Sequence, residues 1–71
     1  MKRIPVVSSS ITTIAYVLDT NLLEVEFRHG ASYQYFAVPS ATFDAFLVAN
    51  SKGAYFNQHI KGRYPFRRID T

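Results

Sequence analysis

The sequence predicts an α+β domain: a three-stranded antiparallel meander packed against two helices, with the tail as a candidate fourth strand at the edge. Three observations predict this architecture. Residues 11–38 hold three short segments rich in β-branched and aromatic side chains, as strands do. Residues 41–61 place apolar side chains at helical spacing. Pro39 separates the two regions, and a strand ends there because proline has no amide to donate.

The first ten residues predict an irregular or extended lead-in. Pro5 opposes a helix, and the serines at 8–10 favour turns. Three strands are expected to follow, at Ile11–Leu18, Leu23–Phe27 and Ala31–Val38.

Side-chain alternation predicts the pairing of the second and third strands. A three-residue loop, Arg28 to Gly30, with Gly30 in the left-handed conformation sets Val25 opposite Tyr33 and Leu23 opposite Tyr35. All the apolar residues then share one face, whereas a two-residue loop would mix the faces. The tyrosine rings are therefore expected on the core side, with glutamates 24 and 26 and glutamine 34 in water.

The first hairpin is interpreted in the same way. A four-residue loop at 19–22 pairs Leu18 with Leu23 and Tyr16 with Val25, and leaves residues 13, 15 and 17 outside. The resulting sheet has one apolar face and one face that water can reach.

Two helices are expected after Pro39. Ser40 is a good N-cap for the first, Ala41–Asn50, whose aromatic stripe contains Phe43 and Phe46. Ser51 caps the second, residues 52–61, which Gly62 ends. Its core side is predicted to carry Phe56 and Ile60, and a separate stripe carries residues 52, 55 and 59. The tail is extended around Pro65.

Length and composition narrow the class of protein. Seventy-one residues make a single domain, residues 1–71, and the absence of cysteine excludes disulfides and thiolate metal sites. Two histidines distant in sequence, without clustered carboxylates, predict neither a metal site nor a catalytic centre, so we expect a protein that is not an enzyme and uses no cofactor. With no long apolar run and no signal peptide, we expect a cytoplasmic protein without a membrane segment.

The charge is unevenly distributed along the chain. Residues 1–51 hold three basic and four acidic side chains, and residues 52–71 hold five basic side chains and one acidic. Such asymmetry favours an anionic partner for the C-terminal third. Cations interleaved with rings suit RNA or another single-stranded nucleic acid. The candidate binding residues are Lys52, Tyr55, His59, Lys61, Arg63, Tyr64, Arg67 and Arg68.

Two alternatives stay open. Tyr33 and Tyr35, two apart on a strand, could stack bases as in sheet-based RNA readers, although the register places them on the core face. A protein-interaction or self-association module, such as a homodimer, is the second alternative. It would use the small-residue side of the first helix, or Leu22 and Phe36.

Several motifs together resemble the KTSC domain family over about residues 6–69. They are Ser9-Ser10-Ile11, Leu23-Glu24-Val25-Glu26-Phe27, Gly30, Tyr33-Gln34-Tyr35, Val38-Pro39, Ser51-Lys52-Gly53-Ala54-Tyr55-Phe56-Asn57, Ile60 and Tyr64. The resemblance implies a small bacterial or phage domain that occurs alone or at the C-terminus of some lysyl-tRNA synthetases. It also implies RNA as a partner class, without assigning binding residues.

Overall fold

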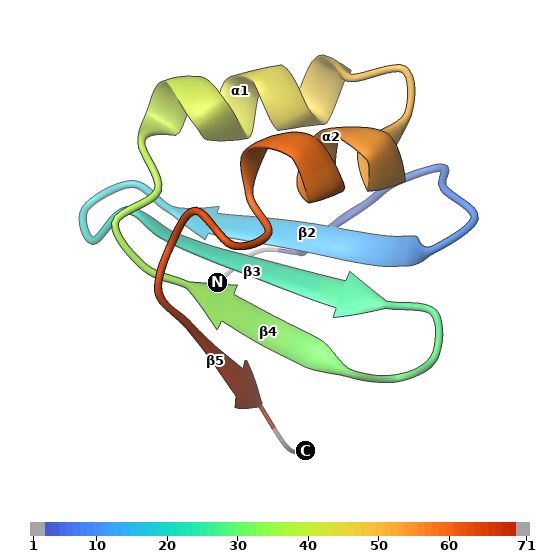
Figure 1. The fold of residues 1–71 in the computed structure, drawn as a ribbon, viewed down its shortest axis with the longest axis horizontal. Coiled ribbons are helices and arrows are strands. Elements are labelled where there is room, and N and C mark those ends of the chain that lie inside the picture. The colour runs from blue at the N-terminus through green and yellow to red at the C-terminus, as the bar shows by residue number, and fades with distance from the viewer. Residues whose placement is uncertain (1–2, 70–71) are drawn as a thin grey trace.

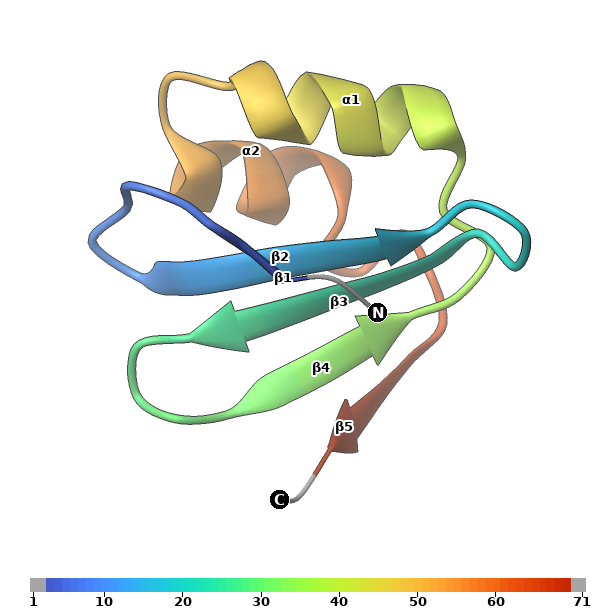
Figure 2. The same ribbon diagram turned by 180° about the vertical axis from the view of Figure 1, so that it is seen from behind.

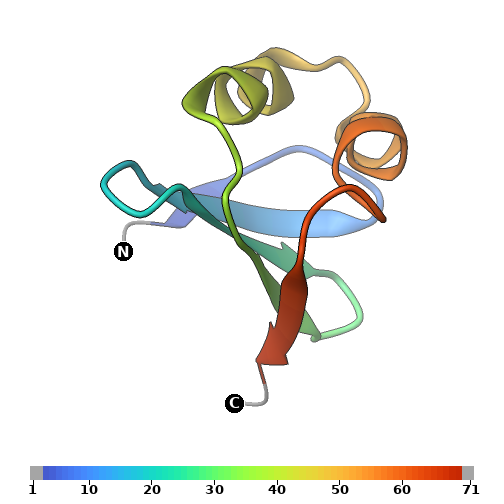
Figure 3. The ribbon, with the colours of Figure 1, turned by 60° about the vertical axis from the view of Figure 1, so that its left-hand side comes forward.

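A five-stranded antiparallel sheet with two helices on one face forms the domain (Figures 1 and 3), in a computed structural model that describes residues 3–69. The strands lie in chain order, β1-β2-β3-β4-β5, so no connection crosses the sheet. The predicted α+β class is confirmed. The elements are β1 (Arg3–Pro5), β2 (Ile11–Val17), β3 (Leu22–Phe27), β4 (Ser32–Tyr35), α1 (Ser40–Val48), α2 (Lys52–His59) and β5 (Phe66–Ile69).

The two edge strands extend the predicted meander, as Figure 2 shows from behind. The lead-in contains β1, in which Arg3 lies opposite Ala15 of β2. An edge strand tolerates Pro5 because its outer side has no partner strand. The tail forms β5 as expected for the candidate edge strand, and places Arg68 opposite Tyr33 of β4.

The β3–β4 hairpin has the predicted register. Leu23 lies opposite Tyr35 and Val25 opposite Tyr33. The Phe27 amide donates to the Ala31 carbonyl at 2.9 Å, and Gly30 has a φ of 99°, which is the left-handed region that glycine enters without strain.

The predicted β2–β3 register is wrong by two residues: Tyr16 lies opposite Leu23 and Ile14 opposite Val25. A two-residue shift leaves every side chain on its face, so the hydrophobic pattern could not detect it. An irregularity between Ile11 and Thr13 then turns Ile11 into the core, where it is fully buried. Ala15, expected outside, is also buried because β1 lies beside it.

The helix boundaries differ slightly from the prediction. The N-cap of α1 is Pro39 rather than Ser40, and Pro39 makes no capping hydrogen bond because its side chain has no acceptor atom. Ser51 caps α2 as predicted, with its Oγ accepting from the Ala54 amide at 3.2 Å. Each helix ends two residues early, at Val48 and His59.

The core lies between the sheet and the helices. Phe46 of α1, together with Phe56 and Ile60 at the core side of α2, packs on the inner residues of β2, β3 and β4. Tyr35 is 5% exposed and belongs to this core, whereas Tyr33 is only half-buried. The prediction that both tyrosines of β4 lie on the core face is therefore correct, but the helices cover Tyr35 more completely than Tyr33.

Candidate nucleic-acid interface

The structure separates the eight candidate residues. The Lys52 Nζ donates to the Ala49 carbonyl at 2.6 Å, beside the end of α1. Arg63 Nε donates to the Gln58 carbonyl at 2.9 Å. Arg67 lies on the helix-free face of the sheet, opposite Gln34, whereas Arg68 points to the other face because side chains alternate along β5. These residues therefore do not form one continuous basic surface.

Tyr55 is part of the junction between α1 and α2. Its ring stacks on the buried Phe46 with centroids 5.5 Å apart, and the ring of His59 lies 4.5 Å away. Its hydroxyl donates to the Thr42 carbonyl at 3.1 Å, and burial, with a smaller contribution from Tyr64, raises its pKa. Tyr64 itself packs against the core. Both tyrosine rings already have structural partners.

An aromatic groove of about 470 Å³ opens between the sheet and the end of α2. Its five rings come from β3, β4, α2 and β5: Phe27, Tyr33, Tyr35, Phe56 and Phe66. His29, Asn57 and Lys61 supply its polar lining together with the tyrosine hydroxyls.

The rings of the aromatic groove hold one another in place. Phe27 contacts Tyr33 and Phe56 edge-on at 5.8 and 5.2 Å, and Phe56 contacts Tyr35 at 5.4 Å. Phe66 packs on both tyrosines, at 5.8 and 5.6 Å. Tyr35 and Phe56 are buried and form the floor, whereas Tyr33 is half-buried and Phe66 is 57% exposed. Burial raises the pKa of Tyr35 to about 12, with a smaller contribution from Tyr33.

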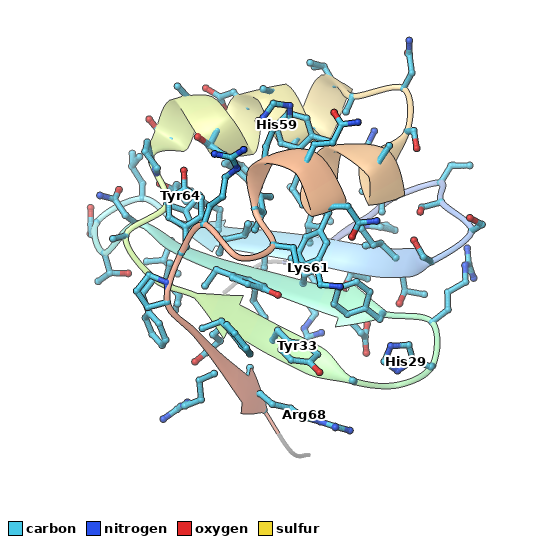
Figure 4. The ribbon with its side chains drawn as sticks, viewed as in Figure 1. His29, Tyr33, His59, Lys61, Tyr64 and Arg68 are labelled. Carbon is cyan, nitrogen blue, oxygen red and sulfur yellow. The ribbon has the colours of Figure 1, made fainter. Side chains whose placement is uncertain are left out.

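Basic side chains surround this groove (Figure 4). Lys61 lines it after α2, and His29 lines it from the β3–β4 loop, stacked on Phe27 at 5.6 Å. Arg68 lies beside Tyr33 on the neighbouring strand. None of the described residues that line the groove is acidic.

The acidic side chains of the sheet lie on its opposite face. Glu24, expected in water, is 7% exposed and forms an ion pair with Arg3, because β1 brings that arginine across the sheet. Arg3 also lies 3.5 Å from Glu26. Gln34 links this pair to β5: its Nε2 donates to Glu24 at 3.4 Å and its Oε1 accepts from Arg67 at 3.5 Å. This network keeps negative charge away from the aromatic groove.

Sequence reasoning missed Phe27, His29, Asn57 and Phe66 as members of one site. The sequence signal that could have found them is the alternation of Tyr33 and Tyr35 on one face of β4. Their partners on β5, Arg68 and Phe66, alternate in the same way. Among residues 3–69, no three histidine or acidic side chains gather in a way that could hold a metal ion. In the same range, no helix has the length and apolar character needed to cross a membrane.

Comparison with known proteins identifies the family. The KTSC domain matches residues 7–64, a range that includes every groove residue except Phe66. A crystal structure of a KTSC domain protein from Yersinia pestis superimposes with a TM-score of 0.93 at 43% identity, covering 97% of both chains. An uncharacterized protein of Stutzerimonas stutzeri is 45% identical over 99% of this chain and all of its own length. A lysine–tRNA ligase of Nostoc punctiforme is 38% identical over 86% of this chain, which spans 11% of that enzyme. The chain belongs to the KTSC domain family.

Proposed function

We propose that this domain is a non-catalytic binding module for single-stranded nucleic acid, with RNA as the preferred class, and that the strand binds in the aromatic groove. The observation that carries the proposal is the combination of accessible rings and surrounding cations at one place. Aromatic side chains stack bases of any sequence, and cations beside them contact the phosphates. Of the eight candidate residues, Lys61 and Arg68 are the two that this geometry uses.

The charge around the groove favours an anionic ligand over a cationic one. Clustered rings also bind quaternary ammonium groups through the negative faces of their π-systems. Here Lys61 lines the same hollow and Arg68 lies beside Tyr33, so a cation would be repelled. The carboxylates of Glu24 and Glu26, which would attract a cation, are paired with Arg3 on the opposite face. A base with its phosphate fits both features of the groove.

The relatives support RNA over DNA. A segment similar to this chain occurs in the lysine–tRNA ligases of Nostoc punctiforme and Trichormus variabilis. Those enzymes are named for a tRNA substrate, and a small appended module that holds unpaired RNA is compatible with that setting. With RNA as its partner, the proposal places the domain in the cytoplasm.

Paired charge reversals test the proposal. Lys61→Glu with Arg68→Glu changes two cations at the groove, and Arg63→Glu with Arg67→Glu changes the net charge equally away from it. Affinity for a fluorescent single strand, measured by displacement at low salt, is expected to fall in the first variant and to stay close to wild type in the second. Equal weakening in both would show that only net charge matters. No saturable binding of RNA or DNA by the wild-type chain would overturn the proposal.

A second candidate function is self-association. Next to the end of α1, a hollow of about 520 Å³ is lined by Ile4–Val7 and residues 47–50 and 52, and Val7 and Val48 are 97% and 80% exposed. Exposed apolar side chains gathered at one place are typical of interaction surfaces. Sedimentation over a range of concentrations would detect a homodimer, and Val48→Asp is expected to abolish it. A wild-type chain that stays monomeric at high concentration removes this candidate.

A further inference from the structure

We infer that the aromatic groove is a site for one unpaired nucleotide and its two flanking phosphates, rather than part of a long track for a strand. This inference rests on the proposed function. It is carried by the juxtaposition of one exposed ring pair, Tyr33 and Phe66, with two cations, Lys61 and Arg68.

The dimensions of the groove limit how much of a strand it can hold. Its volume of about 470 Å³ falls in the lower half of the ~300–1,000 Å³ range of small-molecule sites. The single-stranded sites of OB-folds, by contrast, extend over roughly 4–16 nucleotides. A single nucleotide is the unit that matches a hollow of this size.

The ring geometry sets how the base stacks. The centroids of Tyr33 and Phe66 lie 5.8 Å apart with their planes tilted by 51°, which is a contact between neighbours. A base cannot enter between rings that already touch, so it stacks on the exposed side of one of them. Phe66, at 57% exposure, offers the larger free surface. The amide of Asn57, which can both donate and accept, lies in the same lining and can bond a base edge.

The placement of the cations limits the number of phosphate contacts. Lys52 and Arg63 donate to backbone carbonyls elsewhere, and Arg67 is on the opposite face. Arg28 donates to the Ser8 carbonyl at 2.7 Å, away from the groove. Lys61 lines the groove and Arg68 lies beside Tyr33 on the same face, so their positions allow two phosphate contacts. For a single strand, each contact contributes about −0.7 to the slope of log affinity against log salt, so the expected slope is about −1.4.

A length series with a salt titration tests this inference. Unlabelled uridine oligonucleotides of two to twelve residues would displace a labelled twelve-residue strand. Affinity, corrected for the number of binding registers, is expected to level off by about three nucleotides. Arg68→Glu should reduce the slope by about 0.7, and Arg67→Glu on the opposite face should leave it unchanged.

The outcomes separate the inference from the proposed function. Register-corrected affinity that still rises beyond about eight nucleotides, with a slope of about −2.8 or steeper, would overturn the one-nucleotide site and leave strand binding intact. Equal slopes in the Arg68→Glu and wild-type chains would also overturn it. An absence of saturable binding at every length would overturn the proposed function itself.

Discussion

Two aromatic clusters in this domain have nearly the same ingredients and different surroundings. At the helix junction, Tyr55 packs with Phe46 and His59, and its hydroxyl bonds the Thr42 carbonyl. At the β4–β5 edge, Tyr33 packs with Phe27, which in turn stacks with His29. The first cluster is covered by α1, whereas the second lies between the end of α2 and the short edge strand β5 and forms a groove.

Rings and cations that lie near each other in sequence therefore do not identify a binding surface. Tyr55 lies three residues from Lys52 and four from His59, and its neighbourhood looks like a stacking site in the sequence. Tyr33 lies four residues from His29 and has no lysine or arginine within four residues, and Arg68 lies beside it only through strand pairing. Cover by a neighbouring element decides which ring stabilises the fold and which can meet a ligand.

The largest effect is expected at the covered cluster. Phe46→Ala removes a ring that is fully buried between α1, α2 and the sheet, so it should lower the free energy of unfolding by about 3–5 kcal/mol. Urea denaturation followed by circular dichroism measures this loss. Phe66→Ala, at the exposed end of the groove, is the matched control and should cost much less. Equal losses in the two variants would break the distinction between the clusters.

The parts of the fold that the sequence predicts are those set by local patterns, and the parts that it misses depend on distant pairing. The β3–β4 register was accessible because a one-residue slip would exchange the faces, and Gly30 marks the turn. The β2–β3 register was not, since a two-residue shift preserves the faces. The aromatic groove depends on β5 pairing with β4, which joins Tyr35 to Phe66 across the whole helical region. No local pattern contains that pairing, so charge placement alone selected Tyr55 and Arg67.

Tyr35 connects the core to the groove floor and should make stability sensitive to alkaline pH. Its pKa is raised from 10.0 to about 12, so the protonated form is favoured in the folded state. This contribution is complete below about pH 10 and is lost as the pH rises through about 12. A two-unit shift corresponds to at most about 2–3 kcal/mol. Tyr35→Phe should flatten the unfolding free energy between pH 9 and 12, and a profile identical to wild type would contradict this.

The open cluster should control binding rather than stability. Phe66→Ala is expected to weaken binding of a single strand by about 1–3 kcal/mol, the usual contribution of one stacked base. Displacement of a labelled oligonucleotide measures the loss. Phe36→Ala serves as the control, because Phe36 is also exposed but does not line the groove. A Phe66→Ala variant that binds as tightly as wild type would show that stacking occurs elsewhere.

The smallest effect separates the two roles of a tyrosine at the helix junction. Tyr55→Phe keeps the ring on Phe46 and removes only the hydroxyl that donates to the Thr42 carbonyl. We expect a loss of about 0.5–1.5 kcal/mol in unfolding free energy, the net contribution of one hydrogen bond. Single-strand affinity should not change, because the ring lies outside the aromatic groove. If Tyr55→Phe instead weakened binding while leaving stability intact, the stripe of Lys52, Tyr55 and His59 would be the binding surface, and the covered cluster would have to open to admit a base.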